Sequence, residues 1–532
     1  MIDTSINSCI NSNASLGIDQ ACFSILNLYI NPVIFYAIAW EAYTGTGVPL
    51  ATLRPKSNTS LIISTKYPLH IYYQTIEPHK NYEYCHTTYT FKEYGSYGWN
   101  ISSADICSNI YVIHEPRNSY FPILTAFMIY MLLAVTWTTS KVIIRVIRGK
   151  LIAILLMIFV NNGGGKYVFF NHSAWFGLSV ADLILPWFAW IMGMSITISK
   201  RAELRLTTSR VKITLCCLRR SAILILLGLM LNSMHSKSLN DLRFPGILQL
   251  LAVSYFVCAI LETIFMKPHS QDILLQFGRF AIFRDILDSW PQWLIMAGII
   301  TTHTLITFFL HIPNCPAGYF GPGGEYHYRG KYMNCTAGAA GYIDRLIFGN
   351  HTYSKVKDSI YGQILRYDPE GLMNTISAIF IVYLGVHAGK ILLLYYQGNA
   401  RLIRWFLWAV FTGIIAGILC NFESQGGAIP VSKRMMTLSY VLICSSFAFL
   451  LYALLYFLID YKQFWSGAPF IYAGINPIFL YVGHVLTKDL FPWAWNIAHP
   501  SHASLLTMNL WTTTLWAIIA FLLYRKDIII TI

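Results

Sequence analysis

The chain has 532 residues, of which 55% are hydrophobic and only 12% are charged, and its formal net charge is +14. Soluble domains carry about a quarter charged residues, so this composition excludes an ordinary soluble enzyme and indicates a polytopic membrane protein. The mean hydropathy of +0.51 agrees. The basic residues lie between apolar segments and form no compact basic domain, which favours membrane topology over a nucleic-acid partner.

Residues 1–117 precede the first clear apolar span and predict a small β-rich domain on the luminal side. The segments 69–76 and 82–91 alternate apolar and polar residues and are separated by Gly, Pro and Asn, the pattern of short strands. No basic region followed by an apolar core marks a signal peptide near the start of the sequence.

Cysteines and sequons agree with a luminal location for two parts of the chain. Six cysteines fall in even numbers within the expected luminal segments, which indicates disulfides in an oxidising compartment but leaves their pairing open. They are Cys9, Cys22, Cys85, Cys107, Cys315 and Cys335. Sequons, which indicate a glycoprotein, occur at Asn13, Asn58, Asn100, Asn334 and Asn350.

Residues 118–532 are expected to form a membrane domain with about eleven transmembrane helices. Apolar windows of about twenty residues, the length that crosses a bilayer, predict these spans. They lie near 120–139, 151–170, 177–198, 221–239, 246–266, 291–311, 372–394, 404–420, 435–459, 468–487 and 506–524. The second window ends in glycines, so we expect it to stop partway or to bend.

Basic loops predict the orientation of this domain. The loop 200–220 and the link 141–150 are rich in Lys and Arg, which indicates that both are cytosolic. An odd number of spans then places the N-terminus in the lumen and the C-terminus in the cytosol. In this scheme the long, glycine-rich loop 312–371 is luminal, and we expect it to form an ordered cap.

His172 and Asp182 are the candidate catalytic pair. Ionisable groups in or beside a membrane segment cost about 2.5–3.5 kcal/mol each on insertion scales, so they are candidates for function. A carboxylate can hold an imidazole in one tautomer while the ring transfers a proton. The two residues would be about 15 Å apart in a continuous helix, so contact requires a bend around 172–177, which Gly177 allows. An interfacial histidine and a helix-packing aspartate are the structural alternative.

Asn161, a candidate catalytic residue, precedes the run Gly163, Gly164, Gly165 and Lys166, which is a candidate for substrate or cofactor binding. Glycines let a backbone approach a ligand closely and present N–H groups to a carbonyl or phosphate. The run does not match the GxxxxGK[ST] phosphate loop. Without other support, a flexible luminal turn is the favoured interpretation.

Further polar residues lie inside or at the start of predicted spans. Such groups are more often satisfied against neighbouring helices than part of a site, and acidic residues at a helix start favour a structural role. We nevertheless assign Asn374 and Asn476 to the candidate binding site. The others are Asp368, Glu370, His387, Lys390 and His484. No CxxC motif is present, and no metal site is expected.

Several sequence blocks occur in one order along nearly the whole chain. They are VNNGGGKY from Val160, HSAWFGLSVADLILPWFAWIMGMSI from His172, RFPGILQ from Arg243, SWPQW at 289–293, CPAGYFGPGG, NCTAGAAGYIDR, YDPEGLMNTISA and LGVHAGK. Together they resemble the lysosomal acetyl-CoA:heparan-α-glucosaminide N-acetyltransferases and their bacterial relatives. So many blocks are far more specific than any single motif.

The resemblance implies transfer of an acetyl group from cytosolic acetyl-CoA, the co-substrate, to the terminal α-glucosamine amine of heparan sulfate in the lysosomal lumen. It places the family's active-site histidine on His172, its motif aspartate on Asp182 and its motif asparagine on Asn161. His172 would then take a proton from the amine while Asp182 orients it, and Asn161 would donate to the oxyanion, a role worth roughly 3–4 kcal/mol in other acyl transfers. Covalent acetylation of His172 is the alternative route. The implied protein is a multi-pass lysosomal membrane protein, with a homodimer as one option for its assembly.

Three positions depart from the family pattern. Arg145 stands where an aspartate is usual, Leu250 replaces an arginine and Phe176 replaces an asparagine. The cytosolic link expected before the second span is almost absent. If these groups contact donor or sugar, the affinity or the substrate choice is expected to differ, or the protein to be impaired.

Two other functions fit the same residues. A proton-coupled secondary transporter would also use buried His and Asp groups in many spans. A membrane O-acyltransferase acting on another sugar would share the chemistry but not the acceptor atom.

Overall fold

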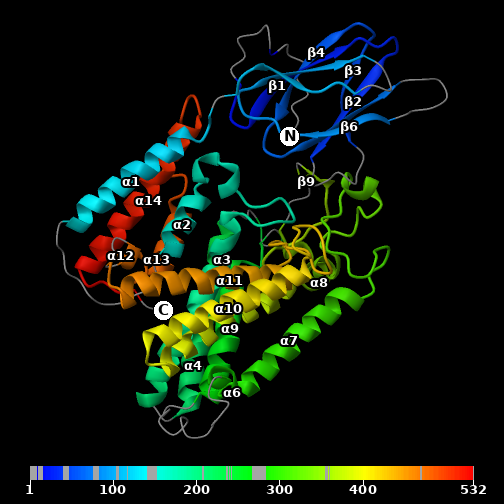
Figure 1. The fold of residues 1–532 in the computed structure, drawn as a ribbon. Helices are drawn as coiled ribbons and strands as arrows, with labels where there is room; N and C mark the ends of the chain where they lie inside the picture. Colours follow the sequence, from blue (N-terminus) through cyan, green and yellow to red (C-terminus); the bar gives the residue numbers. More distant parts are fainter. Residues whose placement is uncertain are drawn as a thin grey trace.

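The computed structural model contains two β-sheets formed by the N-terminal part of the chain and a bundle of long helices formed by the rest (Figure 1). The structure describes residues 16–39, 47–75, 83–102, 107–116, 118–139, 152–206, 209–234, 242–266, 283–353, 360–465 and 470–530, together with residues 9, 238, 240, 357, 358 and 467.

The eight N-terminal strands form a β-sandwich. They are β1 (Gln20–Asn27), β2 (Val33–Ala39), β3 (Val48–Leu53), β4 (Asn58–Ser64), β5 (Leu69–Thr75), β6 (Glu83–Tyr89), β7 (Ser96–Ile101) and β8 (Tyr111–His114). One sheet has the order β4-β1-β7-β8, in which β1 and β7 are parallel, and the other has the antiparallel order β3-β2-β5-β6. Aromatic side chains of both sheets, including Phe23, Phe35 and Trp99, fill the space between them. This β-rich region agrees with the alternating pattern of the sequence.

Three disulfides join the six cysteines of the expected luminal segments. The pairs are Cys9–Cys22, Cys85–Cys107 and Cys315–Cys335. The prediction of disulfides is therefore confirmed, and the structure supplies the pairing that the sequence left open.

Fourteen helices follow in the described part of the chain. They are α1 (Phe121–Thr139), α2 (Ile152–Asn161), α3 (Val180–Leu206), α4 (Arg210–Ser233), α5 (Ile247–Phe265), α6 (Arg284–Leu287), α7 (Trp290–Phe309), α8 (Gly338–Phe348), α9 (Leu372–Leu394), α10 (Gly398–Leu419), α11 (Leu438–Tyr456), α12 (Phe470–Ala473), α13 (Pro477–Leu486) and α14 (His502–Arg525).

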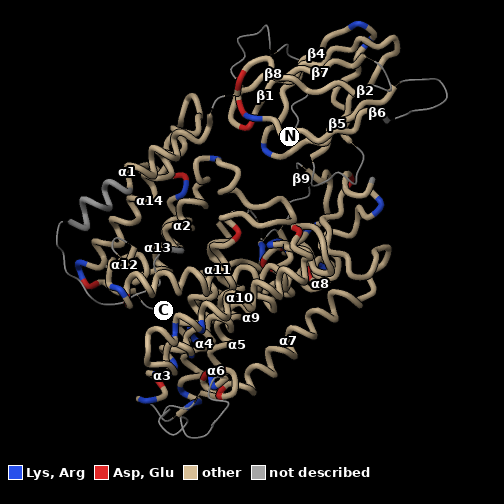
Figure 2. The backbone as a smooth tube through the Cα atoms, in the orientation of Figure 1, with Lys and Arg blue, Asp and Glu red and all other residues tan. Residues whose placement is uncertain are grey.

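Eight helices within the described ranges are long and apolar enough to cross a membrane. They are α3, α4, α5, α7, α9, α10, α14 and the continuous segment from Leu438 to Tyr461 that begins with α11. Long stretches of these helices carry no charge, and a group of charged residues lies beside α6 and the ends of α3 and α4 (Figure 2). The polytopic membrane fold is therefore supported.

The expected count of eleven spans is not confirmed. The window 151–170 is α-helical only over α2, because Gly163, Gly164 and Gly165 follow with φ values of 109°, 52° and 69°, the left-handed region that glycine tolerates. The window 468–487 is broken into α12 and α13, since Pro477 cannot continue a helix from the preceding turn.

The helix that carries Asp182 is fixed by a close crossing with α9. A Cβ atom at Gly193 of α3 would lie 1.9 Å from the carbonyl oxygen of Val382, and one at Gly385 of α9 would lie 1.8 Å from that of Trp190. Only glycine permits this approach of two backbones, which is the usual device for tight helix packing in membranes.

The β-sandwich is tied to the helical domain by the first residue of α14. His502 Nε2 lies 2.9 Å from Glu93 Oε2, and His502 Nδ1 lies 2.8 Å from the carbonyl oxygen of Gly165. The ring also stacks on Tyr167, with ring centroids 4.5 Å apart. A carbonyl and a carboxylate both accept hydrogen bonds, so both contacts form when both ring nitrogens carry a proton. A protonated His502 therefore links the sandwich to the glycine turn after α2.

Two carboxyl groups respond to this arrangement. Burial alone would raise the pKa of Glu93, but hydrogen bonds from His502 and Ser119 lower it to about 2. Burial, reinforced by Glu93, raises the pKa of Asp19 to about 6. The Glu93 carboxyl group therefore remains ionised at and above pH 4.5, which is the ordinary pKa of a glutamate. Asp19 binds its proton more tightly in the folded state, so its contribution to stability falls as the pH rises from about 4 to 6.

We predict that Glu93→Gln lowers the thermal unfolding midpoint by on the order of 2 °C at pH 5 and by less at pH 8. The bridge is strongest while both ring nitrogens of His502 carry a proton, and it weakens as the pH rises and the ring releases one of them. Intrinsic fluorescence of the full chain in detergent measures the midpoint. The exposed Glu115→Gln serves as the control, and an equal loss at both pH values would contradict the prediction.

Candidate active site

His172 and Asp182 lie in direct contact. His172 Nδ1 is 2.8 Å from Asp182 Oδ1, because the chain bends between residue 172 and the start of α3, with Gly177 at φ 101°. Asp182 Oδ2 accepts hydrogen bonds from the backbone N–H groups of Ser173 and Ser179, each at 3.1 Å, and from the Ser179 hydroxyl at 2.9 Å. The carboxylate is fully buried, so these donors offset the cost of removing its charge from water.

Lys433, in the loop before α11, contacts both residues of the His172–Asp182 pair from a distant part of the chain. Its Nζ lies 2.8 Å from His172 Nδ1, 3.2 Å from His172 Nε2 and 3.5 Å from Asp182 Oδ1. Since Nδ1 donates to Asp182, it cannot also accept from the lysine. Burial lowers the pKa of Lys433, and the carboxylates of Asp182 and Glu370 oppose that shift. An amino group therefore lies beside Nε2, the ring nitrogen not held by Asp182.

Asn161, the last residue of α2, lines the same cavity as His172. Its Nδ2 lies 3.1 Å from Nε2 of His484 on α13. A neutral His484 with its proton on Nδ1, which faces the Leu480 carbonyl oxygen at 3.2 Å, accepts this bond and fixes the direction of the amide.

The cavity runs along α3. Its volume is about 510 Å³, within the range of about 300–1,000 Å³ typical of small-molecule sites. One face of α3 forms its wall through Ala181, Ile184, Leu185, Phe188, Ile191, Met192 and Ser195. This face is about 21 Å long at 1.5 Å per residue. A long, mostly apolar channel therefore leads away from His172.

The far end of the cavity carries a cation. Arg220 of α4 and Tyr255 of α5 line it, and the guanidinium lies 4.8 Å from the centre of the tyrosine ring. Arg220 Nε is buried without a hydrogen-bond partner, and no described carboxylate forms an ion pair with this arginine. A half-buried guanidinium without an ion-pair partner among the described residues favours an anionic ligand.

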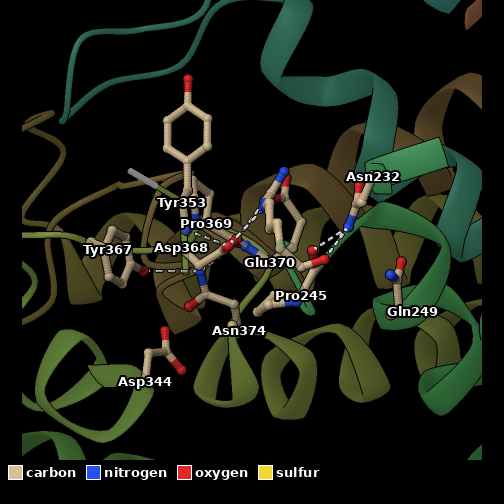
Figure 3. Close-up of polar contacts among 12 residues, drawn as sticks. Asn232, Pro245, Gln249, Asp344, Tyr353, Tyr367, Asp368, Pro369, Glu370 and Asn374 are labelled. Carbon is tan, nitrogen blue, oxygen red and sulfur yellow. Dashed lines mark hydrogen bonds and ion pairs between the residues drawn. The ribbon is translucent and has the colours of Figure 1, made fainter. Parts of the chain in front are cut away.

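Arg243 and Glu370 also line the cavity. Together with the buried Asp368 they form a network of charged residues, of which Figure 3 labels Asp368 and Glu370. Arg243 donates from Nε to Asp368 Oδ2 at 2.7 Å and from Nη2 to Asp368 Oδ1 at 2.5 Å, and it also donates to Glu370 Oε2. Asp368 further accepts from the backbone N–H groups of Tyr353 and Glu370, at 3.1 and 3.0 Å.

Several residues predicted to bind a ligand do not line the cavity within the described part of the chain. The glycines 163–165 and Lys166 form the turn that ends α2, and Lys166 is exposed. Asn374 instead donates to the Tyr367 hydroxyl at 3.0 Å and to the Pro369 carbonyl at 2.8 Å (Figure 3). Asn476 pairs with the backbone of Ile528 and Ile530, both at 2.8 Å. These contacts are structural because they satisfy buried backbone and side-chain groups of neighbouring segments.

His387 and Lys390 also lie apart from the cavity. Lys390 pairs with Glu262 of α5 at 2.9 Å, and His387 Nε2 lies 3.5 Å from Asp285 of α6. Within the ranges that the structure describes, no group of three or more His, Cys, Asp or Glu could hold a metal ion.

The three departures have different surroundings. Leu250 is buried in the main core between helices and does not line the cavity, and Phe176 packs against the cluster around Trp175. Arg145 lies outside the described residues.

Comparison with known proteins gives two curated relatives, while no protein-family model matches. Heparan-alpha-glucosaminide N-acetyltransferase of Mus musculus is 43% identical over 385 residues, and that of Homo sapiens is 44% identical over 386 residues. Each match covers 71% of this chain. The chain is similar to these two enzymes along most of its length. The resemblance seen in the motifs is confirmed, and the matched region covers 58% of each relative.

Three basic residues that were not predicted from the sequence line the cavity: Lys433, Arg434 and Arg243. A signal existed: the expected topology places all three in luminal loops, where the positive-inside rule disfavours basic residues. Basic residues on the unfavoured side indicate a function other than topology.

Asp344 of α8 is predicted to make the folded state more stable at acidic pH. Burial, with the charge of Asp368 nearby, raises its pKa to about 7 from 3.8. The folded state then binds a proton that the unfolded state releases, so the free energy of unfolding falls as the pH rises from about 4 to 7. Asp344→Asn keeps an acceptor for the backbone N–H of Leu372, 2.9 Å away, and should flatten this dependence.

Thermal unfolding midpoints at pH 5 and pH 8 check the prediction. The exposed Asp489→Asn should retain the wild-type difference between the two pH values. An unchanged pH dependence in Asp344→Asn would show that another group is responsible.

Proposed function

We propose that the protein transfers an acetyl group from cytosolic acetyl-CoA to the amine of a terminal α-glucosamine of heparan sulfate, at the luminal end of its cavity in the lysosomal membrane. The observation that carries the proposal is one cavity with the His172–Asp182 pair at one end and the uncompensated Arg220 at the other. The names of the two relatives support the reaction class and the acceptor.

The shape of the cavity suits acetyl-CoA. This donor carries its thioester at the end of a long, flexible arm and its phosphates at the opposite end. In the proposed pose the arm lies along the apolar face of α3, the phosphates approach Arg220, and the acetyl carbon reaches His172. The basic loop 200–220 lies at the Arg220 end and would attract the negatively charged donor from the cytosol.

His172 acts as the general base in this proposal. With Nδ1 donating to Asp182, Nε2 is the nitrogen that takes a proton from the attacking amine, and the carboxylate stabilises the imidazolium that forms. Asn161 and Lys433 supply donors for the negative oxygen of the tetrahedral intermediate. The proton on His172 then passes to the sulfur of CoA as the C–S bond breaks.

The topology proposed from the basic loops fits this arrangement. Residues 1–117 and the loop 312–371 would be luminal and residues 118–532 would form the membrane domain. Ile38 of the sandwich packs in one cluster with Trp175, Ala337 and Tyr361, which supports placing the sandwich, the cap and the His172 end on one side.

We predict that His172→Ala lowers acetyl transfer by about 10³-fold, because a general base contributes about 10²- to 10⁴-fold. Asp182→Asn should lower it by about 10²-fold or more, since the amide supports the wrong tautomer of His172. Labelled acetyl-CoA and glucosamine, mixed with the full chain in detergent, provide the measurement.

The exposed His311→Ala is the matched control and should retain wild-type activity. Full activity of His172→Ala would overturn the proposed role. In sealed vesicles, label that crosses the membrane without reaching the sugar would instead favour a transporter, and an ester product would favour an O-acyltransferase.

We predict that Arg220→Met raises the KM for acetyl-CoA by roughly tenfold with little change in kcat, because the lost contact is to the donor's phosphates and not to the reacting carbon. Arg219→Met, on the exposed side of the same helix turn, should leave the KM unchanged. Equal effects of the two substitutions would argue against a phosphate contact at Arg220.

A further inference from the structure

The group formed by Arg243, Asp368 and Glu370 contains more negative than positive charge. Arg243 and Asp368 form a pair through two parallel hydrogen bonds, which neutralises both. Glu370 is a second carboxylate on the same guanidinium. One positive and two negative charges leave the group with one negative charge in excess.

Glu370 presents that excess charge to the cavity. Asp368 is fully buried, whereas the side chain of Glu370 is 15% exposed and lines the cavity. Glu370 Oε2 accepts from Arg243, and no described residue donates to Oε1. Among the described residues that line the cavity, Glu370 is the only carboxylate.

The other charged groups around the cavity are basic. Lys433 lies close enough to interact electrostatically with both Asp182 and Glu370. The Tyr481 ring lies near Glu370 and Arg243. A cationic ligand entering this end therefore meets one favourable anion, Glu370, on the same cavity as His172.

We propose that Glu370 binds the protonated amine of the acceptor sugar and takes its first proton. This inference rests on the proposed function and names the group that selects an amino sugar. The ammonium would lie between Glu370 Oε1 and the His172 end, where a charge-assisted hydrogen bond forms in a site largely shielded from water.

Two bases balance the protons of the reaction. An ammonium group has three N–H bonds and the amide product keeps one. Glu370 takes the first proton and leaves a neutral amine, whose nitrogen attacks the acetyl carbon. His172 takes the second proton and delivers it to the sulfur as the C–S bond breaks, and Glu370 later releases its proton to water.

The surroundings of Glu370 suit a temporary proton carrier. Burial raises the pKa of Glu370, an effect that Arg243 opposes and Asp368 reinforces. A carboxylate with a raised pKa accepts a proton more readily from an ammonium than an exposed one does.

Binding of two sugars to the full chain in nanodiscs at pH 6 tests the selection step. We expect the wild type to bind glucosamine at least roughly tenfold more tightly than glucose, which has a hydroxyl group in place of the amine. Glu370→Gln, which keeps the shape but not the charge, should lose this preference. Glu325→Gln, in the same luminal loop but outside the cavity lining, should keep it.

The pH profile of transfer tests the proton step. The ratio of Glu370→Gln activity to wild-type activity should rise toward one as the pH is raised from 5 to 9, because the amine then arrives without its extra proton. A substitution that damaged only the structure would lower activity at every pH.

The outcomes separate this inference from the proposed function. A wild type without preference for glucosamine, or a Glu370→Gln variant that keeps the preference, would overturn the role of Glu370. If the protein prefers glucosamine to glucose through Glu370 but transfers no acetyl group, the proposed function would be overturned and the ammonium-binding site would stand.

Discussion

The carboxylate of Asp182 is the constraint on which the candidate site depends. It is fully buried in the first turn of α3, where unpaired backbone N–H groups favour an anion. Its two oxygens accept from His172, Ser173 and Ser179, so one side chain holds the whole bend 172–179 against the helix. The Tyr440 hydroxyl donates to the carbonyl oxygen of Asp182 at 2.5 Å and anchors the same turn to α11. Removing the charge would release the histidine, the bend and the contact to Lys433 together.

The sequence predicted those parts of the site that lie close together along the chain. Asp182 and His172 are ten residues apart, and Gly177 provided the bend that contact requires. Apolar windows located most of the spans, because a helix that crosses a bilayer needs about twenty apolar residues in succession, and this pattern can be read from a single segment. The break at Pro477 and the glycine turn after α2 were also marked by residues that end helices.

Contacts between residues that are far apart along the chain could not be predicted from one sequence. Lys433 reaches His172 across 261 positions and Arg243 reaches Asp368 across 125. Asn374 and Asn476 were assigned to the site, although polar groups in membrane helices are more often satisfied against neighbouring helices. Their amides instead satisfy backbone groups of the segments packed against them, a use that depends on tertiary neighbours the sequence does not name.

Two carboxylates at one end of the cavity differ in what surrounds them, and this difference supports different roles. Asp182 accepts hydrogen bonds at both oxygens from groups fixed by the fold, so it is suited to remain charged and orient His172. Glu370 has one oxygen on Arg243 and one without a described donor, and it faces the cavity. A carboxylate that has an oxygen without a hydrogen-bond donor can exchange a proton with a ligand. A carboxylate whose oxygens both accept hydrogen bonds cannot do so without breaking those bonds. The surroundings of each carboxylate, more than its residue type, therefore decide its role: Asp182 orients His172, and Glu370 exchanges a proton with the ligand.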